Sequence, residues 1–203
     1  MEVMQKKIAL IKSLNMKNSV RTFIAVKIKP ERELKTFFRE LKKLFSEESI
    51  KWVDEDNLHL TLRFLGETTN EQVQMLLSSL KKIALQTGNF KIKLKGVGYF
   101  KSNRFPRVIF INATELTNLK LLAASIEEES QNTGFEPEGR EFNPHLTLGR
   151  IKYLKNRDRL IQFISEWKDS EFQEVLIKEI ILYQSILNEK EPVYKPLGKF
   201  ELK

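Results

Sequence analysis

The same four residues, His-Leu-Thr-Leu, occur twice in this 203-residue chain, at His59–Leu62 and at His145–Leu148. The two copies contain both histidines of the sequence. Side chains alternate between the two faces of a β-strand, so each copy would place His and Thr on one face and both leucines on the other. The repeat therefore predicts two similar half-buried strands, one in each half of the chain.

Two such strands side by side would give a groove with two imidazoles and two hydroxyls on its floor. Near neutral pH a neutral histidine can take a proton from a nucleophile, and a protonated one can give a proton to a leaving oxygen. Threonine hydroxyls can hydrogen-bond phosphate oxygens as negative charge builds on them. The pattern predicts His59 and His145 as catalytic residues, and Thr61 and Thr147 as substrate-binding residues.

Two other interpretations of the repeat compete with this one. A single His-x-Thr is most often an ordinary half-buried strand, but here two copies use up all the histidines. A metal site would need carboxylate ligands as well, since the chain has no cysteine and neither copy has an acidic residue two places on. We expect no metal and no cofactor.

Composition limits the partner and the compartment. The formal net charge of +8 and the pI of about 9.5 favour a polyanion such as RNA or another phosphate ester, although lysine-rich chains can be basic without binding nucleic acid. The absence of cysteine excludes a disulfide framework and a thiol nucleophile, and weakly supports a reducing, cytoplasmic location. No apolar run approaches the roughly 20 residues of a membrane span. We expect a monomer, because no helix stands out as an interface.

Hydrophobic periodicity predicts alternating strands and helices. Strands are expected at about 21–29, 50–53, 58–65, 90–95, 108–113, 145–150, 177–187 and 193–202, and helices at about 34–45, 69–83, 116–126 and 160–167. Thr69 and Gln72 resemble a capping box at the start of the second helix. We predict an α+β fold with two similar lobes, 19–115 and 116–203, in a single domain over 19–203. Residues 1–18 are expected to form a poorly ordered extension.

Around both motifs the chain resembles the two-histidine (2H) phosphoesterases. The resemblance is strongest to the bacterial and archaeal RNA 2′,3′-cyclic phosphodiesterase branch, also called 2′-5′ RNA ligase. It runs from Arg21 to the C-terminus, and its most specific parts are the segments 51–67 and 142–150. These segments read Lys-Trp-Val, then Asn-Leu-His-Leu-Thr-Leu-Arg-Phe-Leu-Gly-Glu, and Phe-Asn-Pro-His-Leu-Thr-Leu-Gly-Arg.

The resemblance implies a bilobal α+β fold, with antiparallel sheets lining a central cleft and helices packed outside. It implies hydrolysis of a terminal 2′,3′-cyclic phosphate on RNA to a 2′-phosphate, with 2′-5′ joining of RNA ends as related chemistry and no metal. His59 would donate the proton and His145 would accept it. Other open functions are cleavage of 2′-5′ oligonucleotides or small cyclic nucleotides, and RNA binding without catalysis.

Residues next to the motifs give weaker expectations. Arg63 continues the alternation of His59 and Thr61, so it is predicted to reach the groove and meet phosphate. Arg150 has the opposite parity for a flat strand, but a bulge at Gly149 would turn it inward. Phe64 is predicted to lie in the core. Phe100, beside a basic stretch at 101–107, is interpreted as a packing residue, with base stacking as the alternative.

Overall fold

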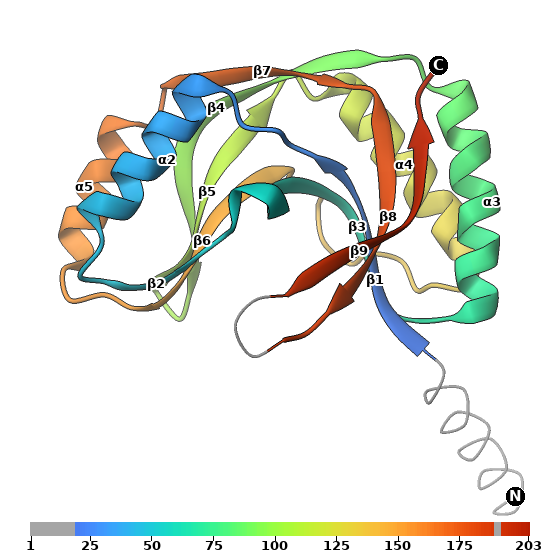
Figure 1. Ribbon diagram of the computed structural model, residues 1–203, viewed down its shortest axis with the longest axis horizontal. Coiled ribbons are helices and arrows are strands. Elements are labelled where there is room, and N and C mark those ends of the chain that lie inside the picture. Colours follow the sequence, from blue (N-terminus) through green and yellow to red (C-terminus); the bar gives the residue numbers. More distant parts are fainter. Residues whose placement is uncertain (1–18, 189–191) are drawn as a thin grey trace, which may run out of the picture.

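One antiparallel sheet forms a curved layer, and helices pack on its outer face (Figure 1). The computed structural model describes residues 19–188 and 192–203, so the predicted extension at 1–18 lies outside the described residues. The elements are β1 (Ser19–Lys27), α2 (Arg32–Leu44), β2 (Ser49–Trp52), the 3-10 turn η1 (Glu55–Asn57), β3 (His59–Thr69), α3 (Asn70–Gln86), β4 (Phe90–Ser102), β5 (Phe105–Thr114), α4 (Thr117–Asn132), β6 (His145–Tyr153), α5 (Arg157–Glu166), β7 (Glu171–Ile177), β8 (Glu179–Ile186) and β9 (Val193–Glu201).

The two motif strands, β3 and β6, are neighbours at the middle of the sheet. The strand order is β7-β4-β5-β6-β3-β1-β8-β9, with β2 paired to β6 beside this path. β3 and β6 share a single register pair, Leu60 with Leu146, so the two halves of the sheet diverge from that point. The half β7-β4-β5-β6 and the half β3-β1-β8-β9 each contain strands from before and after residue 115.

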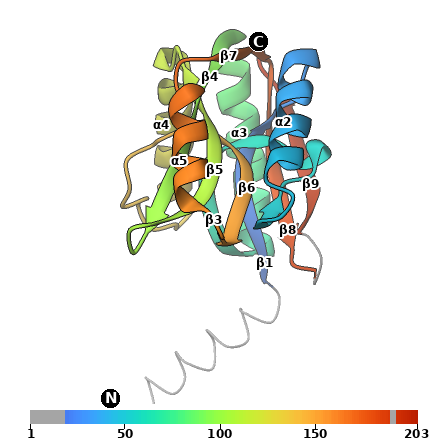
Figure 2. The same cartoon turned by 90° about the vertical axis from the view of Figure 1, so that its left-hand side faces the viewer.

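The core lies between the sheet and its helices. α2 and α5 lie together at one end of the molecule, and α3 and α4 at the other (Figures 1 and 2). The motif leucines are buried as predicted: Leu60, Leu62, Leu146 and Leu148. The predicted capping box is confirmed, because the Thr69 hydroxyl accepts from the Gln72 backbone N–H while the Gln72 side chain accepts from that of Thr69. Along the described ranges, no helix combines the length and the apolar character that crossing a membrane requires.

The strand predictions missed β7 and shortened β3, β4, β5 and β6. β7 was not predicted, because charged residues interrupt its apolar alternation; Glu171 and Glu174 pair with Lys95 and Lys91 of the neighbouring β4. β4 continues to Ser102, and β3 continues past Gly66 to Thr69. Gly66 has φ +74°, a left-handed value that glycine adopts without strain, so the strand does not have to stop there.

Candidate active site

Each histidine is the first residue of its strand and is held by the backbone two residues before it. The Nδ1 of His59 lies 2.6 Å from the carbonyl oxygen of Asn57, and the Nδ1 of His145 lies 2.7 Å from that of Asn143. A carbonyl only accepts hydrogen bonds, so Nδ1 is the protonated nitrogen in both neutral rings. This leaves Nε2 of each ring available to accept or donate a proton.

Aromatic rings fix the other faces of both imidazoles. The His59 ring lies 5.1 Å from Phe23 and 5.2 Å from Tyr194 between centroids, and the second contact is edge-on. The His145 ring lies 5.3 Å from Phe110 and 4.7 Å from Phe100, again with an edge-on second contact. Both sites thus have the same construction, and the aromatic partners are far from the histidines in sequence.

Burial and nearby cations make both imidazoles weaker bases than usual. Burial lowers the pKa of His59 below 6.5, and the charges of His145 and Arg150 lower it further, while the hydrogen bond to Asn57 acts in the opposite direction. Burial also lowers the pKa of His145, with Arg150 again adding to the effect and the Asn143 bond opposing it. In the free protein both rings are therefore mainly neutral at pH 7.

Replacing Arg150 with glutamine should raise the pKa of both histidines, because a cation that disfavours their charged forms is removed. The chain has only two histidines, so an NMR titration of the imidazole signals resolves each one. Arg39→Gln, on the exposed outer face of α2, removes the same charge and should leave both midpoints in place. Unchanged midpoints in Arg150→Gln would show that Arg150 does not face the two rings.

Thr61 and Thr147 follow their histidines on the groove side of the two central strands. Both are half-buried, and in residues 19–188 and 192–203 neither hydroxyl makes a hydrogen bond to another protein group. Two hydroxyls without protein partners, beside two imidazoles, can bind the oxygens of one phosphate.

The prediction that Arg63 reaches the groove is wrong. The register of β1 against β3 pairs Ile24 with Arg63 and Ala25 with Thr61, so Leu62 forms a bulge that turns Arg63 toward the helices. There Arg63 is 5% exposed and forms ion pairs with Glu127 of α4, at 3.0 Å, and Glu138, at 2.9 Å. It also donates to the carbonyl of Glu136.

The same bulge overturns the core assignment of Phe64. Its side chain is 61% exposed and lies on the groove face, with its ring 6.2 Å from that of Phe23. An exposed aromatic ring on the face that carries His59 is suited to stacking against a nucleotide base.

A matching bulge in β6 brings Arg150 to the groove. Phe110 pairs with Thr147 and Ile109 with Gly149, so the extra residue is Leu148 and Arg150 regains the parity of the histidine. Packing requires glycine at position 149, since a Cβ there would lie 2.8 Å from the Trp52 ring. The influence of Arg150 on both histidine pKa values places its charge near both rings.

A small polar cavity adjoins His59. Its volume is about 200 Å³, and strands β1, β8 and β9 contribute to its wall together with η1. The lining includes Lys27, Asp56, Asn57, His59, Tyr183, Tyr194 and Lys199. No sequence pattern indicates this cavity, because its walls come from both ends of the chain.

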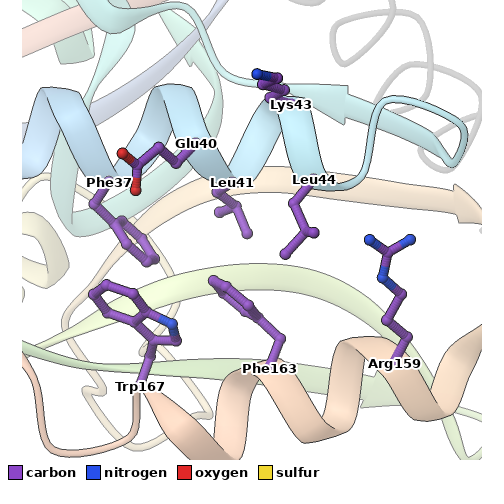
Figure 3. Close-up of a pocket in the computed structure, with 8 residues that line it drawn as sticks. All are labelled: Phe37, Glu40, Leu41, Lys43, Leu44, Arg159, Phe163 and Trp167. Atoms are coloured by element: carbon purple, nitrogen blue, oxygen red, sulfur yellow. The ribbon is translucent and has the colours of Figure 1, made fainter.

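A larger hollow of about 430 Å³ lies outside the groove, between α2 and α5 (Figure 3). Phe37, Leu41 and Leu44 of α2 point toward Phe163 and Trp167 across it. Its charged side chains are Glu40, Lys43 and Arg159, and neither histidine borders it. The predicted catalytic and substrate-binding residues therefore lie outside this hollow.

Nothing in the described part of the chain is arranged as a metal centre. Across residues 19–188 and 192–203, no three side chains among His, Asp and Glu come together as metal ligands. The two imidazoles and two hydroxyls can instead transfer protons and bind an anion directly.

Comparison with known proteins identifies the family of this chain. The family model described as LigT like Phosphoesterase matches the chain twice, over residues 26–110 and 111–194. The chain belongs to this family of 2H phosphoesterases, and the two matches show that its α+β fold is built from two repeated halves, as predicted.

Individual relatives narrow the assignment. An RNA 2′,3′-cyclic phosphodiesterase of Methanocaldococcus jannaschii is 38% identical over 181 residues, which cover 89% of this chain and all of the relative. The Archaeoglobus fulgidus protein of the same name is 35% identical over 79% of this chain and 89% of its own length. A crystal structure of a Thermus thermophilus protein superposes with a TM-score of 0.74 at 30% identity, covering 90% of this chain and 97% of the other. Within the family, the chain belongs with the RNA 2′,3′-cyclic phosphodiesterases, which are phosphodiester hydrolases.

Proposed function

We propose that this protein hydrolyses a terminal 2′,3′-cyclic phosphate on RNA to a 2′-phosphate, using His145 as the general base and His59 as the general acid. The equivalent anchoring of the two rings is the observation that carries the proposal. Both rings bind a backbone carbonyl through Nδ1 and keep Nε2 for proton transfer. Two such rings beside one phosphate site can serve the entering and the leaving oxygen in one step.

In the proposed step, Nε2 of His145 removes a proton from water and the water oxygen bonds to phosphorus. The bond from phosphorus to the ribose 3′ oxygen breaks on the opposite side, and Nε2 of His59 gives its proton to that oxygen. The products are a 2′-phosphate and a 3′-hydroxyl, with His145 protonated and His59 neutral. Solvent removes the proton from His145 and returns one to His59 before the next turnover. The choice of the 3′ oxygen as leaving group rests on the family resemblance.

Three residues are proposed to bind the phosphate. The Thr61 and Thr147 hydroxyls donate to its non-bridging oxygens, and the Arg150 guanidinium balances the charge that builds on them. Arg150 reaches this position through the bulge at Leu148. No cofactor takes part in the proposed step. A single chain is sufficient, because one sheet carries all five groups.

With a 5′-hydroxyl of a second RNA in place of water, the same two histidines would form a 2′-5′ phosphodiester. The pI of about 9.5 suits a second polyanionic strand at the groove. We propose this joining as a secondary activity of the same site.

The test is product analysis of an oligoribonucleotide ending in 2′,3′-cyclic phosphate, with EDTA present. We expect quantitative conversion to the 2′-phosphate, which resists phosphomonoesterases specific for 3′-phosphates. A 3′-phosphate product would keep the acid–base pair and reverse the orientation of the ribose. Absence of turnover, with binding that weakens steeply in salt, would favour an RNA-binding protein without this activity.

A further inference from the structure

The cavity beside His59 lies on one side only of the proposed reaction centre. His59 is part of its wall, and none of the lining residues comes from β4, β5 or β6, the strands around His145. The ring of His59 is also the more deeply buried of the two imidazoles. The two sides of the groove are thus equivalent in their histidines and different in their surroundings.

This difference bears on where the substrate lies. In an in-line displacement at phosphorus, the entering and leaving oxygens are on opposite sides. The leaving oxygen stays attached to a ribose and a base, which need an enclosed space, whereas water does not. At about 200 Å³ the cavity is smaller than the roughly 300–1,000 Å³ pockets of drug-sized ligands, so it suits one nucleoside portion and not a dinucleotide.

The charges in the cavity are separated. Lys27, the register partner of His59, and Lys199 of β9 lie on the β1 and β9 sides, while Asp56 belongs to η1. In the described residues, neither lysine has a carboxylate within ion-pair distance. An anion would be attracted to the lysines and repelled from Asp56, whereas ribose hydroxyls or base N–H groups suit the oxygens of η1.

The positions of Lys27 and Lys199 suit a phosphate on the 5′ side of the terminal nucleoside. In the strand order β3-β1-β8-β9, Lys27 is one strand from His59 and Lys199 is three, which is about 5 and 14 Å along a flat sheet. A ribose held at His59 carries its 5′ oxygen away from the cyclic phosphate. Both lysines line the cavity, so a phosphate on that oxygen at the β1 and β9 side would meet their positive charges.

We infer that the cavity beside His59 binds the terminal nucleoside, and that Lys27 and Lys199 bind the phosphate on its 5′ side. The enzyme would thereby read one phosphate beyond the cyclic one. This distinguishes the end of an RNA chain from a free nucleoside 2′,3′-cyclic phosphate. The inference rests on the proposed function, and it is consistent with His59 as the group that protonates the leaving ribose oxygen.

The experiment compares two small substrates, adenosine 2′,3′-cyclic phosphate and its 5′-phosphorylated form, with EDTA present. For the wild type we expect kcat/KM to be at least about tenfold higher with the 5′-phosphate, the size of effect of one charge-assisted contact. In Lys27→Ala/Lys199→Ala that ratio should fall to about one, because only the phosphorylated substrate loses a charge-assisted contact. A structural defect would lower both rates and leave the ratio unchanged.

The matched control is Lys81→Ala/Lys82→Ala, which removes the same two charges from the exposed surface of α3 and should keep the wild-type ratio. A ratio of one in the wild type would overturn the inference and leave the proposed function intact. A ratio that survives in Lys27→Ala/Lys199→Ala would place the 5′-phosphate elsewhere. If the ratio falls equally in the control, the preference for the 5′-phosphate comes from the overall positive charge of the protein and not from these two lysines. Absence of turnover of either substrate, and of the oligoribonucleotide, would mean that the proposed function itself fails.

Discussion

His59→Ala and His145→Ala should each lower kcat on an RNA 2′,3′-cyclic phosphate by about 10²–10⁴-fold, the usual contribution of one general acid or base. The two rings are expected to act in one displacement, so the double variant should be far less impaired than the product of the two single effects. The measurement is single-turnover conversion of the oligoribonucleotide with EDTA present. Thermal unfolding of each variant checks that the aromatic packing around the missing ring is retained.

The pH dependence of the variants assigns the two roles. The base works deprotonated and the acid works protonated, so wild-type kcat/KM should be bell-shaped. Because both pKa values lie below 6.5 in the free protein, its maximum should fall on the acidic side of pH 6.5. His145→Ala should lose the acidic limb. Its remaining basic limb reports the loss of the proton from His59 alone.

His59→Ala should show the opposite loss, with residual activity that no longer declines at high pH. If the limbs were exchanged between the two variants, His59 would be the base and the orientation of the ribose would be reversed. If both variants kept more than about a tenth of wild-type kcat, neither ring would be the proton carrier.

The parts of the site that could be predicted from sequence are those set by local alternation. His59, Thr61, Leu60 and Leu62 follow the period-two pattern of a strand, and the structure places the leucines in the core as expected. Proline, glycine and capping residues also influence only their neighbours in the chain. The four helices predicted from them and from the apolar spacing overlap the four α-helices in the described part of the chain.

What was not predictable depends on partners far away in the chain. The bulge in the pairing of β3 with β1 turns Arg63 toward the helices and Phe64 toward the groove. A single sequence does not show where such a register shift occurs. The bulge next to Arg150 was anticipated only because Gly149 marked it. Lys27 and Lys199 line the same cavity as His59 because of the order of four strands, which no local pattern encodes.

Arg63→Met should lower the free energy of unfolding by about 3 kcal/mol while leaving kcat of the folded protein within a few-fold of wild type. The substitution keeps the length of the side chain and removes a cation that is 5% exposed, so Glu127 and Glu138 lose their partner. Removing one member of a buried ion pair typically costs about 3–5 kcal/mol, and the lower value applies because Glu138 is partly in water. Urea unfolding, with an unchanged m-value, measures the difference.

Arg150→Ala is the contrasting variant, because Arg150 is exposed and faces the groove. It should unfold within about 0.5 kcal/mol of wild type, as exposed substitutions usually do, and lose about 10–100-fold in kcat/KM, the value of a hydrogen bond to a charged group. If Arg63→Met were as stable as wild type and catalytically impaired, Arg63 would contact substrate as its sequence position first indicated.

A compensating change separates the loss of an ion pair from a simple packing defect at Arg63. Adding Glu127→Gln to Arg63→Met removes the carboxylate nearest the lost Nε atom, which otherwise stays partly buried without its cation. The double variant should therefore recover part of the lost stability, although two side chains now differ from the wild type. If the stability losses of Arg63→Met and Glu127→Gln simply added in the double variant, Arg63 would stabilise the protein through its packing against α4. The ion pairs would then contribute little.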